Sequence, residues 1–435
     1  MIQYNRVLLV SPEYNFPSSG GMYPNGGLLS IGTLLQSRGC EVQIIHMVPD
    51  KYDIAALEVA IRGFRPDLVG ISVMTFQTKS AKAVARAVKS VDWEIPVVVG
   101  GPHVSAVTNN ALKEIRNADC AFYGEAEQAM VDFVEGRNVE TGRHDVVKDL
   151  DSLPFTDLSL INLDNYTSPA PPGPRPSMSM MATRGCPFRC NFCSRAVFGN
   201  TVRRMSPERV VEEVEYLHKR WGIQEIFIMD DTFNLKRDWA VEVFELLIKK
   251  GLDKLRYKAP FRANEKLVDA ALLKLAKRAG VWLIFYGVES GNQEMLSRMN
   301  KGLELGEIRR AFALTHKAGI KTTASFIVGY PGETPETIKQ SQEFAVELKP
   351  FWIGFSRLTP FPGTKVCTDV KQAGHLLETD YDLYRPDKVL ARTEAMTADE
   401  IEAAARKLDD WTYQIKMKHL LTHPSMAYQV LKDRV

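Results

Sequence analysis

Long apolar stretches and strong net charge are both missing from this chain of 435 residues. Nowhere do about 18 apolar residues follow one another, so we expect no membrane-spanning helix, and the N-terminal apolar run is too short for a signal peptide. The net charge is only +2, so no overall basic field favours nucleic acid as a partner. Because 45% of the residues are hydrophobic, we expect a cytoplasmic globular protein with a substantial core.

Cysteine is scarce as well, with six residues in the whole chain. Cys40, Cys120 and Cys367 are scattered singly, which argues against a disulfide framework and fits a reducing cytosol. Cys367 can serve as an acid, a hydrogen donor or a covalent thiol, but a lone cysteine after a turn is more often inert. Only Cys367 lies in the last part of the chain, beyond residue 365.

The other three cysteines lie together in the run RGCPFRCNFCSRAVFG, as Cys186, Cys190 and Cys193. This CxxxCxxC spacing supplies three thiolates, whereas a [4Fe–4S] cluster normally takes four protein ligands. One iron then keeps an open position at which a small molecule can chelate. Zinc is the alternative, but structural zinc usually takes four ligands in paired spacings. No fourth cysteine is near, and the closest histidine, His218, falls in a predicted helix, so we favour the cluster.

Short apolar strands alternate with helical stretches over residues 1–140. Their Val, Ile and Leu content without polar alternation predicts strands covered on both faces, and therefore a doubly wound, Rossmann-like parallel sheet of about five strands. Ligands bind such sheets beyond the carboxyl ends of the strands. Residues 141–177, with five prolines between Pro169 and Pro176, are expected to form a linker. Strands are expected at 7–10, 42–45, 68–73 and 97–99, and a helix at about 28–37.

A second α/β series occupies residues 178–365. Ser206 predicts the start of one helix, and Gly251, Gly280 and Gly319 predict the ends of others. Six βα units make a partial (β/α)6 barrel, open on one side, with reactive loops at the carboxyl ends of the strands. The strands are expected at 178–182, 225–229, 257–261, 282–287, 322–328 and 352–358.

Residues 366–435 are expected to form a small, mostly helical C-terminal region. Its end is basic and amphipathic, and such a tail can rest on a membrane surface and admit a lipid-like substrate. We favour the alternative of a solvated helix face packed on the domain. The basic residues concerned are Lys416, Lys418, Lys432 and Arg434.

Polar side chains follow the barrel strands where the strands end. Asp230 and Asp231 follow the second strand, where paired carboxylates can bind a metal, accept hydrogen bonds from a cofactor, or simply cap a helix. Arg262 closes the third strand, and its guanidinium can fork onto a carboxylate. The fourth strand ends at Glu289, beside glycines that let the backbone approach a ligand. The fifth and sixth strands end in the runs SFIVGYPGE and TPFPGT.

In order and spacing, these motifs from about 178 to 365 resemble the radical S-adenosylmethionine superfamily. The resemblance implies that S-adenosylmethionine chelates the open iron and is split reductively to a 5′-deoxyadenosyl radical. It also implies an external low-potential electron donor, such as flavodoxin or ferredoxin. The residues expected to contact S-adenosylmethionine are Phe192, Asp230, Arg262, Glu289, Ser290, Ser325 and Gly329.

The whole arrangement resembles the class of that superfamily with an N-terminal cobalamin-binding domain. Many cobalamin proteins carry a DxHxxG loop after the first strand, but here the loop reads SPEYN and has no histidine. By position Phe76 should lie under the corrin, although it can equally be an ordinary loop aromatic. His103 is a candidate contact for the nucleotide tail or a residue with local hydrogen bonds only. The expected cobalamin-binding residues are Ser11, Glu13, Ser72, Thr75, Phe76, Gln77, Gly100, Gly101, His103, Gly124 and Glu125.

The resemblance predicts a cobalamin-dependent radical enzyme that methylates an unactivated carbon, or phosphorus, of a small-molecule, lipid or peptide substrate. One S-adenosylmethionine would remethylate the cobalt and a second would yield the radical. The alternatives are a cyclisation or ring rearrangement with the same cofactors, and a radical enzyme whose first domain binds no cobalamin. A cluster-bearing binding or redox-sensing module is the non-enzymatic alternative. The sequence names no catalytic residue beyond the cluster ligands.

Overall fold

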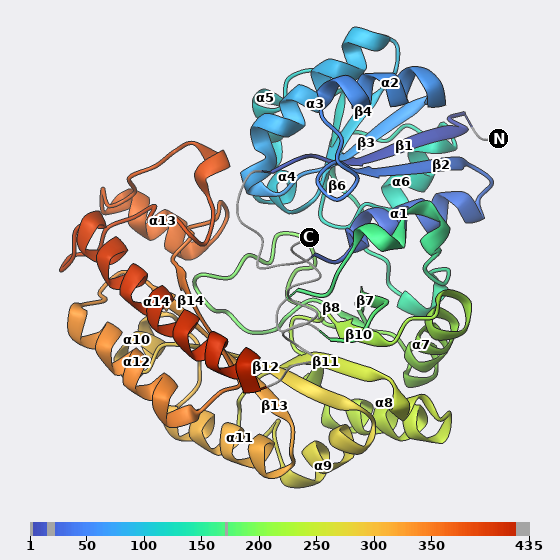
Figure 1. The fold of residues 1–435 in the computed structure, drawn as a ribbon. Helices are drawn as coiled ribbons and strands as arrows, with labels where there is room; N and C mark the ends of the chain where they lie inside the picture. Colours follow the sequence, from blue (N-terminus) through green and yellow to red (C-terminus); the bar gives the residue numbers. More distant parts are fainter. Residues whose placement is uncertain (1–2, 15–21, 170–172, 423–435) are drawn as a thin grey trace.

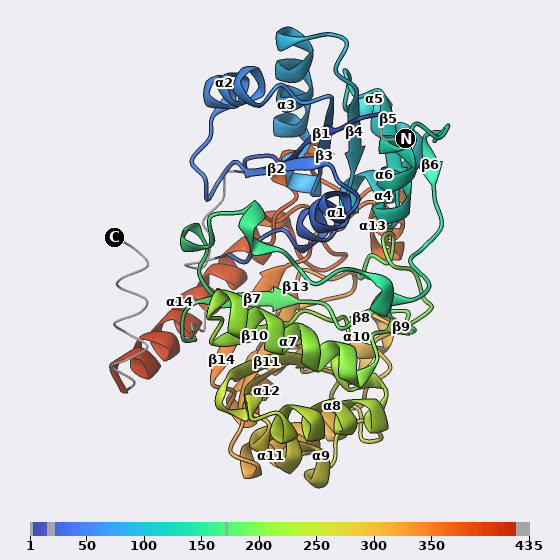
Figure 2. The same ribbon diagram turned by 90° about the vertical axis from the view of Figure 1, so that its right-hand side faces the viewer.

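A computed structural model describes residues 3–14, 22–169 and 173–422 of the chain, with side chains as far as residue 417. Two α/β units lie one above the other, the N-terminal sheet at the top of Figure 1 and the second sheet below it. Helix α1 (Gly26–Ser37) covers the side of the upper sheet that faces the lower unit, which Figure 2 shows in the turned view. The expected α/β class and the order of its two units are confirmed.

The N-terminal sheet is parallel throughout, with the strand order β2-β1-β3-β4-β5-β6. Alternate residues of β1 enter two different cores, since Val7 and Leu9 pack with α1 while Leu8 and Val10 pack on the opposite face. The strands are β1 (Arg6–Ser11), β2 (Glu41–His46), β3 (Leu68–Ser72), β4 (Val97–Gly100), β5 (Cys120–Tyr123) and β6 (Gly142–Arg143). The other helices are α2 (Ile54–Phe64), α3 (Thr78–Val91), α4 (Pro102–Val107), α5 (Ala111–Glu114) and α6 (Glu127–Val134).

The last strand of this sheet, β6, lies in the segment that the sequence predicts as linker. It has only two residues and pairs through its backbone with Phe122 and Tyr123 of β5. A strand this short carries no apolar run, so hydrophobic pattern alone gives no sign of it.

The second unit is a parallel sheet of six strands in the order β14-β13-β12-β11-β10-β7, so the expected partial barrel is confirmed, with β7 and β14 at its open edges. The strands are β7 (Ser177–Met180), β10 (Glu225–Ile228), β11 (Arg256–Phe261), β12 (Val281–Glu289), β13 (Lys321–Val328) and β14 (Trp352–Arg357). The helices are α7 (Pro207–Trp221), α8 (Arg237–Lys249), α9 (Ala270–Arg278), α10 (Gln293–Arg298), α11 (Leu305–Lys317) and α12 (Pro335–Leu348).

The amino-terminal end of the barrel is closed by a buried polar group. Lys258 of β11 pairs with Glu225 of β10 at 2.9 Å, and the indole of Trp282 donates to the same carboxylate. Ser168 of the linker donates to Glu225 at 2.8 Å and accepts from Lys258 at 2.6 Å, and it contacts the hydroxyl of Tyr23 from the N-terminal unit. The linker and the first loop of the upper unit are thus fixed to the barrel floor.

The C-terminal region contains α13 (Lys365–Gln372), the 3₁₀ helix η8 (Tyr381–Leu383) and the long α14 (Ala398–Thr422). Helix α14 runs along the outside of the barrel (Figure 1), where Arg357 of β14 pairs with Glu402 and Asp409. The basic tail beyond residue 422 lies outside the described residues. Among the helices that the structure describes, none is both long and apolar enough to cross a membrane.

Candidate active site

The cysteine run forms a loop between two short paired strands, β8 (Thr183–Arg184) and β9 (Arg203–Arg204). We call residues 185–202 the cysteine loop. Cys186 is half-buried, Cys190 buried and Cys193 exposed at the carboxyl end of the barrel, and all three are free thiols. Gly185 begins the loop with φ +96°, and a Cβ there would lie 2.4 Å from the carbonyl oxygen of Thr201. Only glycine therefore lets the two ends of the loop approach this closely.

Two thiols of the cysteine loop, those of Cys186 and Cys193, are held in their neutral form. Although part of the Cys193 side chain is exposed, the surrounding atoms desolvate its thiol, and this desolvation, together with nearby Asp231, raises the pKa of Cys193 to about 11. Burial also raises the pKa of Cys186. Ligation removes the proton, since a coordinating thiol is deprotonated by the charge of the metal. Among the described residues no three Cys, His, Asp or Glu side chains converge on a single metal ion. In a cubane cluster each of the three thiolates would bind a different iron.

Asp230 lies directly behind the start of the cysteine loop. Its Oδ1 accepts the backbone N–H groups of Ala182 at 2.8 Å and Thr183 at 2.9 Å, which fixes the turn from β7 into β8. Burial raises the pKa of Asp230 to about 7. Its Oδ2 is buried and has no hydrogen-bond partner. The contact of Asp230 with S-adenosylmethionine remains a prediction, and Oδ2 is the atom with capacity for it.

Arg262 and Glu289 lie near the cysteine loop and already have partners. The guanidinium of Arg262 stacks 3.6 Å from the ring centroid of Phe188 and donates to the carbonyl oxygens of Lys301 and Gly302. Glu289 accepts from the Nζ of Lys301 at 2.7 Å. No local sequence pattern marks Lys301, because it lies after α10 and follows no strand.

The remaining residues expected to contact S-adenosylmethionine differ in their surroundings. Phe192 packs against an apolar cluster that includes Met295, while Ser325 is exposed. Ser290 is fully buried and accepts from the backbone of Asn292, at the start of α10. Gly329, with φ +84°, donates its N–H to Glu333. The roles of all four toward the cofactor stay predictions.

Buried polar atoms without partners gather at the carboxyl ends of the barrel strands. In the described part of the chain, eight buried side-chain N or O atoms lack a hydrogen-bond partner. Four of them follow β10, β11, β13 and β14: Asp230 Oδ2, Arg262 Nε, Glu333 Oε1 and Thr359 Oγ1. Because unpaired buried polar groups are rare and costly, this end of the barrel fits a polar ligand.

A cavity of about 690 Å³ lies between the N-terminal sheet and the first barrel strand. It is walled by the carboxyl ends of β3, β4 and β5, by the start of α1 and by β7 with the residues that follow it. The expected cobalamin-binding residues that line it are Ser72, Gly100, Gly101, Gly124 and Glu125. This is the edge of a doubly wound sheet at which ligands are expected.

The other expected cobalamin-binding residues do not line that cavity. Thr75, Phe76 and Gln77 form the 3₁₀ helix η1, and the ring of Phe76 contacts that of Tyr14 at 5.5 Å. Gln77 is buried and bonded to the carbonyl of Pro12. Ser11 is buried at the end of β1, and Glu13 is exposed.

His103 is fully buried and has contacts within the protein. Its Nε2 lies 2.9 Å from Glu114 and its Nδ1 3.4 Å from Thr75 Oγ1. Tyr381 of η8 packs edge-on against the imidazole at 4.9 Å. The C-terminal region is thus in contact with the N-terminal unit as well as with the barrel. A contact of His103 with a nucleotide tail stays a prediction.

Comparison with known proteins agrees with this geometry. The Radical SAM superfamily model matches residues 180–345, and the B12 binding domain model matches residues 16–134. An uncharacterized methyltransferase of Pyrococcus horikoshii is 28% identical, covering 92% of this chain and 91% of its own. The anaerobic magnesium-protoporphyrin IX monomethyl ester cyclase of Cereibacter sphaeroides is also 28% identical, in an alignment that covers 91% of this chain and 68% of the cyclase.

A solved structure shares the two-domain fold. The radical S-adenosylmethionine methyltransferase TsrM of Kitasatospora setae superposes with a TM-score of 0.71 at 20% identity, covering 85% of this chain and 75% of its own. Fold and site together define an enzyme with a B12-binding domain followed by a radical S-adenosylmethionine domain. Residues 180–345 thus match the radical S-adenosylmethionine superfamily, and residues 16–134 match the B12 binding domain. The two matched models imply a [4Fe–4S] cluster with S-adenosylmethionine, and cobalamin, as the cofactors.

Proposed function

We propose that this enzyme methylates an unactivated carbon or phosphorus centre of its substrate. The observation that supports this proposal most directly is that the cavity of the B12-binding domain lies next to the start of the cysteine loop. Arg184 lines that cavity, and only Gly185 separates it from Cys186. A substrate placed between the two sites can reach both within one chain, as transfer of a methyl group to a substrate radical requires.

Bound here, the cluster with S-adenosylmethionine supplies radical chemistry and cobalamin supplies a transferable methyl group. The chain itself supplies the holding groups. Cys186, Cys190 and Cys193 present three thiolates, and Asp230 fixes the strand end from which their loop starts. Arg262 and Glu289 place opposite charges at the carboxyl ends of neighbouring strands, suited to the carboxylate and ammonium of an amino acid moiety.

The test is an anaerobic assay of reconstituted protein with S-adenosylmethionine, hydroxocobalamin and a chemical reductant. We expect cobalamin absorbance on the purified protein and formation of both S-adenosylhomocysteine and 5′-deoxyadenosine. Cys190→Ala should abolish 5′-deoxyadenosine, because the cluster loses a ligand. Cys367→Ala is the matched control, since Cys367 is also buried but lies outside the motif, and it should retain cleavage. Absence of cobalamin uptake would refute the methylase.

A cyclisation or ring rearrangement is the second candidate, supported by the similarity to the magnesium-protoporphyrin cyclase. The same assay separates the two functions. A methylase forms S-adenosylhomocysteine together with 5′-deoxyadenosine in proportion to product, whereas such a cyclase forms 5′-deoxyadenosine without stoichiometric S-adenosylhomocysteine. The substrate class, whether small molecule, lipid or peptide, stays open.

The surface around the cysteine loop suits an acidic low-potential protein, such as flavodoxin or ferredoxin, as the electron donor. Cys190 and Cys193 line an open depression, together with the basic residues Arg189, Arg195 and Lys365. Arg189 is exposed, so Arg189→Glu should slow cleavage driven by flavodoxin several-fold and leave cleavage driven by dithionite unchanged. Equal loss with both reductants would contradict this docking face. The free thiols fit a reducing, cytoplasmic setting.

A further inference from the structure

Both ends of the cysteine loop are held by one carboxylate of the B12-binding domain. Glu125 follows β5, and its Oε2 accepts from Arg184 at 2.8 Å and from Arg203 at 3.0 Å. Its Oε1 forms a further ion pair with Arg203. Arg184 and Arg203 face each other in the β8–β9 pair that brackets the loop. One side chain from the upper domain therefore clamps the stem of the loop that carries the cluster ligands.

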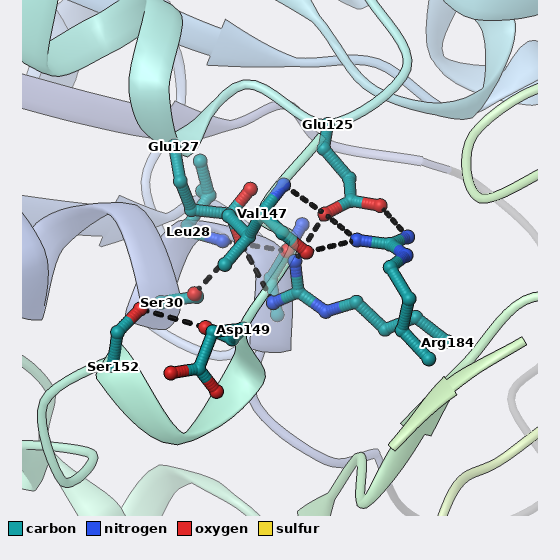
Figure 3. Close-up of polar contacts among 10 residues, drawn as sticks. Leu28, Ser30, Glu125, Glu127, Val147, Asp149, Ser152 and Arg184 are labelled. Atoms are coloured by element: carbon teal, nitrogen blue, oxygen red, sulfur yellow. Dashed lines mark hydrogen bonds and ion pairs between the residues drawn. The ribbon is translucent and has the colours of Figure 1, made fainter. Parts of the chain in front are cut away.

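A second carboxylate extends the clamp to the first helix. Glu127 accepts from the other terminal nitrogen of Arg184 at 2.7 Å, and from the hydroxyl of Ser30 in α1 at 2.9 Å. Figure 3 shows the carboxylates of Glu125 and Glu127 turned toward Arg184, with Ser30 on the far side of Glu127. Arg184, the residue before the cysteine loop, thus pairs with Glu125 after β5 and with Glu127 of α6. Through Glu127 it is also linked to α1.

Three members of this clamp are buried ionisable side chains. Glu125, Glu127 and Arg184 are only 3%, 5% and 8% exposed. Burial opposes the charging of Glu127, but the charge and hydrogen bonds of Arg184 outweigh it, so the pKa of Glu127 lies below its usual value. A buried ion-pair network contributes little net stability over an apolar packing of the same volume. Its strict geometry, however, fixes the relative position of the elements it joins.

The clamp is also part of the wall of the cavity. Glu125, Glu127 and Arg184 all line it, as does Phe198 from within the cysteine loop. The guanidinium of Arg184 lies 5.5 Å from the ring centroid of Phe198. On the same side, Arg143 of β6 donates to the carbonyl of Ala196 in the loop at 2.7 Å. A ligand that fills the cavity therefore touches the same side chains that hold the cysteine loop.

We propose that the clamp, made of Glu125, Glu127, Arg184 and Arg203, couples the two cofactor sites energetically. Cobalamin in the cavity stabilises the loop geometry that holds the cluster, and the assembled cluster stabilises the cavity for cobalamin. Thermodynamic linkage makes the two effects equal in size. The inference rests on the proposed function, because it takes the cavity as the cobalamin site. Its four residues act as positioning residues rather than as cluster ligands.

The test compares the dissociation constant of hydroxocobalamin for the cluster-loaded and the cluster-free full-length protein under anaerobic conditions. We expect the loaded protein to bind more tightly by about fivefold or more. Arg184→Lys keeps the charge but cannot bridge two carboxylates with a planar fork, so the ratio should fall toward one. The electron paramagnetic resonance spectrum of the reduced cluster should shift on adding cobalamin in the parent and not in the variant.

Arg357→Lys is the matched control. Arg357 is a buried arginine of β14 that pairs with Glu402 and Asp409 of α14 on the outside of the barrel, and it does not line the cavity. It should keep the parental ratio. Arg203→Lys is the second variant, in case Arg184→Lys does not fold, and it too should lower the ratio. A ratio near one in the parent, or an unchanged ratio in both clamp variants, overturns the coupling but leaves the function intact. No binding of cobalamin to any form overturns both.

Discussion

Asp230→Asn should make the protein less sensitive to pH, because Asp230 is a buried carboxyl with one satisfied and one unsatisfied oxygen. The amide keeps an oxygen that can accept from Ala182 and Thr183, as Oδ1 does now. Its Nδ2 replaces Oδ2, which has no partner to lose. The substitution therefore retains the hydrogen bonds that fix the turn into β8 and removes only the ability to ionise.

The sign and size of the effect follow from the pKa of Asp230. Burial raises the pKa of Asp230 from 3.8 to about 7. At a pH between these two values, the folded protein therefore holds a proton that the unfolded chain has released. Stability of the parent therefore falls as the pH rises from about 4 through 7, and then levels off. At about 1.4 kcal/mol per pKa unit, the loss is on the order of 4 kcal/mol. Asp230→Asn lacks this loss.

Thermal unfolding of cluster-free protein between pH 4 and pH 8 provides the measurement. We expect similar midpoints for parent and Asp230→Asn near pH 4, and a variant that melts several degrees higher at pH 8. Glu333, whose pKa burial raises to about 8, contributes a similar slope to both proteins and cancels in the difference. A midpoint difference that does not change with pH, or a variant that melts lower at pH 8, would refute the reasoning.

Two further predictions concern the barrel floor and the N-terminal sheet. Lys258→Met should destabilise the protein by about 3–5 kcal/mol, because it leaves the buried Glu225 carboxylate without its cation. A lowered melting temperature would show this loss of stability. The double variant with Glu225→Gln should recover most of the lost stability. Gly101→Ala should cost about 1–3 kcal/mol, because its φ is +96° and the added Cβ would lie 2.9 Å from the Val73 nitrogen. The control Gly63→Ala, in α2 with no atom within 4 Å of its Cβ, should be neutral or stabilising. Equal melting temperatures for the two alanine variants would contradict the backbone argument.

Local sequence pattern was sufficient to predict most of the fold. The continuous apolar runs of β1 and β3 are typical of strands covered on both faces, and these strands are buried on both faces. Ser206 caps α7 by accepting the N–H of Arg209, as its position predicts. Gly280 adopts φ +98° between α9 and β12. In each case a few neighbouring residues determine the local structure, so the sequence contains the whole signal.

Contacts between distant segments could not be predicted in the same way. Glu125 and Arg184 are 59 positions apart, and nothing in either local pattern indicates that they meet. Lys301, the partner of Glu289, follows a helix of six residues rather than a strand. From sequence alone, a charged residue is expected on the solvated surface unless its partner is known. Composition and periodicity therefore cannot predict the buried ion pairs of this protein.

The polar atoms at the carboxyl end of the barrel show how binding energy can be gained. Glu289 is already paired with Lys301, and one terminal nitrogen of Arg262 with two carbonyl oxygens, so a cofactor that contacts these atoms must exchange bonds, with little net gain. Asp230 Oδ2, Arg262 Nε and Thr359 Oγ1 are buried without partners, and each satisfied atom would recover about 1–3 kcal/mol. These atoms follow three different strands of one barrel, so a single ligand must span the carboxyl end of the barrel to reach them. Affinity for a polar cofactor at this end should therefore depend more on these unpaired atoms than on the ion pairs already formed there.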